Sequence, residues 1–114
     1  VDDLINQFLL VLKREGFDLS KRTHTNKIFE EHVRECASLA VKLVRSLYYS
    51  DPEREKLERF VIALCALHDI GKLDPSWKLV PKPPPHAPRS ARWILNKGRR
   101  CWKMLYYPQK MLKH

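Results

Sequence analysis

The sequence contains no acidic residue after Asp74. All 13 of its acidic residues lie at or before that position. Cysteine is also scarce: there are three among 114 residues, and none forms a CxxC pair. This odd number argues against a disulfide framework and favours a reducing compartment, so we expect a cytoplasmic protein. No apolar run approaches the roughly 20 residues that a membrane span needs, and the first residues show no signal-peptide pattern. We therefore expect no membrane partner.

The charge that is present is divided unevenly along the chain. Residues 1–74 carry 12 basic and 13 acidic side chains, whereas residues 75–114 carry 10 basic side chains and no acid, which makes the net charge +9. The basic segment also contains Trp77, Trp93, Trp102, Tyr106 and Tyr107. Cations that follow phosphates and rings that stack on unpaired bases favour single-stranded nucleic acid as a partner. The alternative is a solvated basic face with its aromatic residues in the core.

Apolar spacing predicts an all-α chain without a convincing strand. We expect helices over residues 3–15, over residues 25–48, from a start signal at residues 50–53 to His68, and from Pro88 to about Gly98. The second helix should bury Phe29, Val33, Cys36, Ala40, Leu43, Val44 and Leu47, and the third Leu57, Phe60, Val61, Leu64, Leu67 and His68. Residues 81–85 are proline-rich and should be extended, and residues 99–114 are weakly helical. We predict one domain, residues 1–114, with a core at about 25–97 and a basic aromatic tail at 75–114.

The residues with the clearest chemistry are His68 and Asp69, which end an apolar run. An imidazole and a carboxylate can bind one metal ion together once both are deprotonated. Gly71 allows a sharp turn after them, and Lys72 adds a cation that suits a phosphate. The plainer interpretation is a surface pair at a helix end beside a solvated lysine. Two further histidines, His32 and His86, could complete a metal site, although a single histidine such as His32 is more often a core or capping residue.

The order H … HD … H in a helical chain resembles the HD superfamily of metal-dependent phosphohydrolases. Residues 67–72 are similar to its central motif, and His32 is similar to its first ligand. Within the superfamily, residues 28–95 most resemble the HD nuclease domain of the CRISPR-associated helicase-nuclease of type I systems. In that domain a turn with an aromatic residue, here Trp77, precedes a loop and a histidine with Ser and Ala just after it, here within residues 86–91.

This resemblance implies an HD-domain helical bundle with a divalent metal ion, among Mn²⁺, Ni²⁺, Co²⁺, Fe²⁺, Mg²⁺ and Zn²⁺. It implies that the ion is held by His32, His68, Asp69 and His86, that Asp69 orients a water molecule, and that Lys72 steadies the phosphate. We expect Lys78, Arg89, Arg92, Arg99 and Arg100 to hold a nucleic-acid backbone, with Trp77 stacking on a base and Trp93 in the core. The family continues with a pair of adjacent histidines and a later aspartate. This chain has neither, so the resemblance implies either a helical bundle that is incomplete at its C-terminus or an incomplete metal site.

Three functions are compatible with these residues. The first is a metal-dependent nuclease that acts on single-stranded DNA, or on RNA, in CRISPR interference. Its partners would be a helicase subunit or domain and the CRISPR effector complex. The second is an HD phosphohydrolase that acts on nucleotides or other small phosphate esters. The third is a non-catalytic helical module that binds nucleic acid or docks on a helicase.

Overall fold

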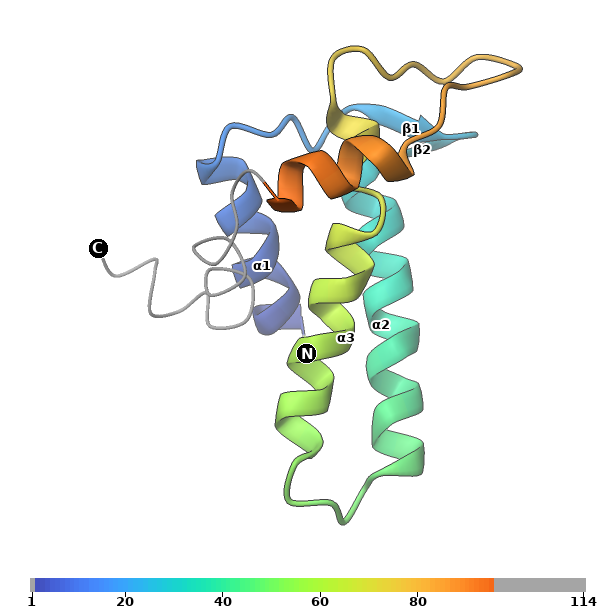
Figure 1. Cartoon of the computed structure of the whole chain (residues 1–114). Helices are drawn as coiled ribbons and strands as arrows, with labels where there is room; N and C mark the ends of the chain where they lie inside the picture. The colour runs from blue at the N-terminus through green and yellow to red at the C-terminus, as the bar shows by residue number, and fades with distance from the viewer. Residues whose placement is uncertain (1, 96–114) are drawn as a thin grey trace.

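The computed structural model describes residues 2–95 and is mostly helical, which confirms the all-α class (Figure 1). The elements in chain order are α1 (Asp2–Arg14), β1 (Arg22–His24), β2 (Lys27–Ile28), α2 (Phe29–Leu47), α3 (Arg54–Leu67) and the short 3₁₀ helix η1 (Ile70–Leu73). A final helical stretch covers residues 87–95. Within the described residues, no helix is both long enough and apolar enough to cross a membrane.

Two long antiparallel helices, α2 and α3, form the body of the molecule, and α1 packs beside them (Figure 1). The core between these helices is apolar and almost fully buried, with Ile5, Phe8, Leu9, Leu12, Phe29, Val33, Ala37, Val41, Ile62, Ala63 and Ala66. Helix α1 ends at Arg14, close to the predicted residue 15, and the φ of +92° at Gly16 suits glycine just after a helix C-terminus. The amides of Gly16 and Phe17 bond back to the carbonyls of Lys13 and Leu12.

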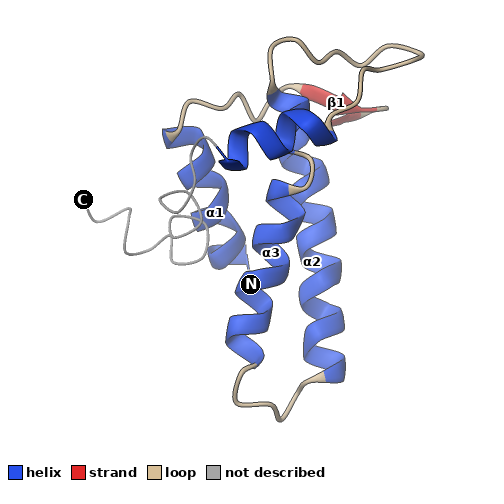
Figure 2. Cartoon of the chain, in the orientation of Figure 1, coloured by secondary structure: helices blue, strands red, loops and turns tan. Residues whose placement is uncertain are grey.

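The antiparallel hairpin of β1 and β2 departs from the predicted structure (Figure 2). Helix α2 begins at Phe29 rather than at residue 25, because residues 22–28 pair as strands around Asn26, whose φ is +66°. Asparagine is among the few residues that adopt this left-handed conformation readily. The amide of Phe29 donates to the carbonyl of Lys21, and the amide of Glu30 donates to the carbonyl of Leu19. Residues before α2 therefore supply hydrogen-bond acceptors for the amides of its first turn.

The predicted buried faces of α2 and α3 are partly wrong. On α2, Ala37 and Val41 are buried while Leu43 and Leu47 are exposed, and on α3, Ile62, Ala63 and Ala66 are buried while Phe60 and Leu64 are exposed. Both helices carry apolar residues on two adjacent faces, and periodicity alone does not tell which face meets a neighbour. Helix α3 begins at Arg54, because Asp51 accepts a bond from the amide of Glu53 in the preceding turn.

The proline-rich residues lie in a loop, as predicted. Residues 78–86 contain no helix or strand and pass over the end of the molecule that also carries the hairpin (Figure 1). The predicted weak helix at 99–114 lies outside the described residues.

Gly71 is needed for close packing, not for the sharp turn that the sequence suggested. Its φ is not positive, but a Cβ atom at this position would lie 2.2 Å from the carbonyl oxygen of His86 and 2.5 Å from the amide nitrogen of Ser90. Both atoms belong to the backbone at the start of the 87–95 helix and cannot rotate away. Glycine therefore lets this helix pack directly on η1.

We predict that Gly71→Ala lowers the free energy of unfolding by about 1–3 kcal/mol, because the added methyl group forces two backbone segments apart. Urea unfolding followed by circular dichroism measures the change. Adding Ser90→Ala to Gly71→Ala should not restore stability, because the closest clashes are with backbone atoms. A Gly71→Ala protein as stable as the wild type would show that the two segments do not meet.

Candidate metal centre

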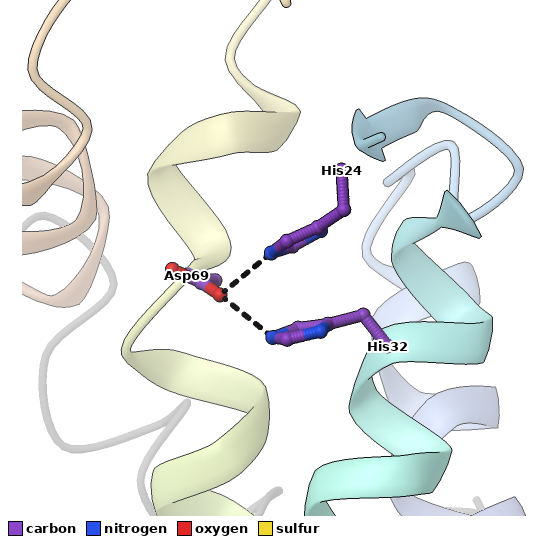
Figure 3. Close-up of side chains that lie close together, drawn as sticks. All are labelled: His24, His32 and Asp69. Carbon is purple, nitrogen blue, oxygen red and sulfur yellow. Dashed lines mark ion pairs between the residues drawn. The ribbon is translucent and has the colours of Figure 1, made fainter. Parts of the chain in front are cut away.

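The Asp69 carboxylate lies between α3 and η1, is only 3% exposed and is surrounded by imidazoles. Its Oδ2 atom lies 3.2 Å from Nε2 of His68, 3.3 Å from Nε2 of His32 and 3.6 Å from Nε2 of His24. Figure 3 shows the His24 and His32 rings side by side with their nitrogens directed at this oxygen. Donors from β1, α2 and the end of α3 thus converge on one atom.

The second carboxylate oxygen faces another pair of side chains. Oδ1 of Asp69 lies 3.0 Å from Nε2 of His86 and 3.7 Å from Nζ of Lys72. His86 comes from the end of the proline-rich loop, and Lys72 from η1. The structure therefore brings together every residue that the sequence suggested as a metal ligand: His32, His68, Asp69 and His86.

The prediction that His68 is buried is wrong, because its side chain is 54% exposed. It shares the solvent-facing side of α3 with Leu64, and its neighbour Asp69 is the buried member of the pair. Nδ1 of His68 lies 3.1 Å from the carbonyl oxygen of Cys65. Because a carbonyl only accepts, Nδ1 carries a proton, and Nε2 is the ring atom that faces Asp69.

The donor set fits a divalent cation. The Nε2 atoms of His24, His32 and His68 lie 3.2–3.6 Å from one carboxylate oxygen, so their lone pairs and that oxygen can bind a single cation between them. Metal-binding histidines characteristically bond a carbonyl or similar acceptor through their second nitrogen, as His68 bonds Cys65. Imidazole nitrogens with one carboxylate suit transition metals better than Mg²⁺, which prefers oxygen.

The environment keeps two of these rings uncharged. Burial lowers the pKa of His24 to about 4, and the nearby Lys72 and His32 act in the same direction. Burial also lowers the pKa of His32, although Asp69 opposes this shift. Both rings are therefore neutral near pH 7, the state in which imidazole binds metal. Burial raises the pKa of the Cys36 thiol, whose sulfur lies 3.5 Å from Nε2 of His32, so this thiol stays protonated.

Lys72 lies beside the carboxylate, as the sequence suggested, and is largely shielded from solvent. Its ammonium group donates to Nε2 of His24 at 3.1 Å and lies 5.5 Å from the ring centroid of Trp77. It is therefore a fixed cation within the site, and not the solvated lysine of the plainer interpretation.

The prediction that Trp77 stacks on a base is wrong. Trp77 is 2% exposed, its indole Nε1 donates to the carbonyl of Pro84 at 2.8 Å, and Lys21 and Lys72 both lie against its ring. The indole is a packed residue that fastens the proline-rich loop. Trp93, expected in the core, is half-buried and packs edge-on against Phe17.

The basic residues that were predicted to bind nucleic acid differ from one another in their surroundings. Arg89 donates to Ser76 Oγ and to the Pro85 carbonyl, so it secures the two ends of the loop. Lys78, at the start of the loop, and Arg92, in the 87–95 helix, are exposed. Arg99 and Arg100 lie outside the described residues.

Ser90 connects His86 to the His-Asp pair. Its hydroxyl donates to the carbonyl of His68 at 3.2 Å and accepts from the amide of Gly71 at 2.7 Å. The helix that follows His86 is thereby fixed to the segment that carries Asp69.

Sequence reasoning missed His24. The residue lies in a polar stretch between the first two predicted helices, and a strand of three residues is too short to show an alternating pattern. Its presence among only five histidines was the available signal.

A helical bundle in which a His-Asp pair meets histidines from other segments defines an HD-type domain, the class that the sequence resembles. The family model described as Cas3, HD domain, matches residues 23–110, and the chain belongs to this family. No curated protein and no solved structure matches the chain. Family membership supports a metal-dependent HD nuclease role in a CRISPR system.

We predict that Trp77→Phe loosens the proline-rich loop, because phenylalanine retains an aromatic ring but cannot donate to the Pro84 carbonyl. Trypsin should cleave after Lys78 several-fold faster than in the wild type, as followed by mass spectrometry. Trp93→Phe is the matched control, because Trp93 makes no bond to the loop among the described contacts. Equal cleavage rates in all three proteins would contradict the role of the indole.

Proposed function

We propose that the chain binds a divalent metal ion through His32, His68, Asp69 and His86. With this ion, we propose that it hydrolyses phosphodiester bonds of single-stranded DNA in CRISPR interference. The observation that carries this proposal is the convergence of three imidazole Nε2 atoms on both oxygens of one buried carboxylate. The family model supports the nuclease class and the CRISPR context.

The protein's own groups have distinct roles in this reaction. When bound, a divalent ion lowers the pKa of a water molecule and polarises a phosphoryl oxygen. Asp69 holds the ion and orients the attacking water, and its buried position keeps competing solvent from one side of the carboxylate. Lys72, 3.7 Å from that carboxylate, steadies the negative charge of the phosphate.

The openness of the site supports a polymeric substrate. His68 and His86 are 54% and 34% exposed, whereas Asp69 beneath them is buried, so a phosphate can approach from the solvent side. Lys78 and Arg92 are exposed and available for contacts with phosphates. We extend the proposal to a helicase subunit or domain and a CRISPR effector complex as partners. The free thiols of Cys36 and Cys65 are in keeping with a cytoplasmic location.

We predict that the protein cuts a labelled circular single-stranded DNA in the presence of Mn²⁺ or Ni²⁺, and that a chelator abolishes cutting. Asp69→Ala should reduce the rate to the level seen with chelator, because both carboxylate oxygens that face the imidazoles are lost. Asp51→Ala is the matched control, because Asp51 lies in the α2–α3 connection at the opposite end of the molecule (Figure 1).

Two results would separate the alternatives. Undiminished cutting by Asp69→Ala would refute the assigned site. Salt-sensitive DNA binding without cutting would favour the non-catalytic module, whereas hydrolysis of nucleotides but not of DNA would favour a small-molecule phosphohydrolase.

A further inference from the structure

The hairpin places an additional imidazole in the centre. The His24 ring stacks on the His32 ring with 3.6 Å between centroids and 21° between planes. Its Nε2 atom lies 3.6 Å from the same Asp69 oxygen that His32 and His68 approach. The ligand atoms of His24, His32 and Asp69 all lie within 4.8 Å of one another.

These separations suit donors of one ion. Ligand atoms bound about 2.0–2.2 Å from a metal lie roughly 3.0–3.6 Å from each other in octahedral or tetrahedral geometry. The three nitrogen-to-Oδ2 distances, 3.2, 3.3 and 3.6 Å, lie in this range. A metal ion can therefore be accommodated with little movement of His24.

The hydrogen bonds of His24 direct a lone pair into the site. Lys72 can only donate, and its bond to Nε2 of His24 makes that nitrogen an acceptor. The proton is then on Nδ1, which donates to the hydroxyl of Thr23 at 2.8 Å. Thr23 is 1% exposed, so the ring is oriented by a buried partner, as is typical of metal-binding histidines.

The geometry points to His24 as a further protein ligand of the metal ion, an inference that rests on the proposed function. His24 then adds a nitrogen to the set of His32, His68, His86 and Asp69, which becomes four nitrogens and one carboxylate. This set favours nitrogen-binding transition metals over Mg²⁺. On metal binding the lone pair of His24 passes from Lys72 to the ion, which releases the ammonium group toward the substrate phosphate.

The competing role for His24 is to hold Lys72 in place without touching the metal. The two roles differ when His24→Ala is compared with Lys72→Met, in which the ammonium group is removed and the length of the side chain is nearly kept. If His24 only holds Lys72, the two variants should change the metal affinity in the same direction. If His24 is a ligand, Lys72→Met binds metal as tightly as the wild type or more tightly, because a competing cation is gone. His24→Ala alone then weakens binding.

We would titrate the untagged 114-residue protein and each variant with Ni²⁺ by calorimetry, and record the visible absorption spectrum of the Co²⁺ form. His24→Ala should raise the Ni²⁺ Kd by at least about tenfold, the smallest loss typical of an outer partner of a metal site, and should shift the Co²⁺ spectrum. Thr23→Val, which keeps the side-chain shape and removes the hydroxyl, should raise the Kd by a smaller factor. Circular dichroism confirms that each variant is folded.

The results separate this inference from the function on which it rests. Wild-type Kd and Co²⁺ spectrum in His24→Ala, with binding lost in Asp69→Ala, would refute His24 as a ligand and leave the proposed centre intact. Unchanged binding in Asp69→Ala would refute the proposed centre itself. If His24→Ala does not fold, a Thr23→Val protein with a wild-type Kd and Co²⁺ spectrum would refute the inference.

Discussion

One buried carboxylate, that of Asp69, is the constraint on which the described structure depends. A carboxylate removed from water is costly unless charges or hydrogen-bond donors compensate it. Its partners come from the hairpin, the first turns of α2, the end of α3 and the loop before the last helix. Four segments must therefore meet at a single point, and this requirement sets how the elements pack at the hairpin end of the bundle.

Several residues that are not metal ligands hold these segments in position. Gly71 lets the last helix approach η1, and Ser90 bonds across that contact to the backbone on both sides of Asp69. Trp77 fastens the loop that leads to His86 and packs against Lys72, while Thr23 orients His24. Because metal binding and catalysis depend on donor positions to within fractions of an ångström, such supporting residues share in the function.

The candidate metal centre combines a carboxylate that is buried with histidines that solvent can reach. The carboxylate is shielded, whereas His68 and His86 remain partly open to solvent. An enclosed pocket would restrict the substrate to small molecules, and a fully exposed one would leave the charges in water, where their interactions are weak. A buried carboxylate beside partly exposed histidines suits a phosphate within a long nucleic-acid chain. This is consistent with membership in the Cas3 HD-domain family.

The helical class, the end of the first helix near residue 15 and the His68-Asp69 pair could be predicted from the sequence, because helical periodicity and the His-Asp motif are local signals. His32 and His86 followed from the resemblance to the HD superfamily. The sequence could not place His24, show that Trp77 is buried, or choose between the two apolar faces of α2 and α3. Each of these depends on which surfaces meet in space. The tertiary structure alone decided that a histidine from a short hairpin stacks on one from a helix, and that both face a carboxylate more than 35 residues away along the chain.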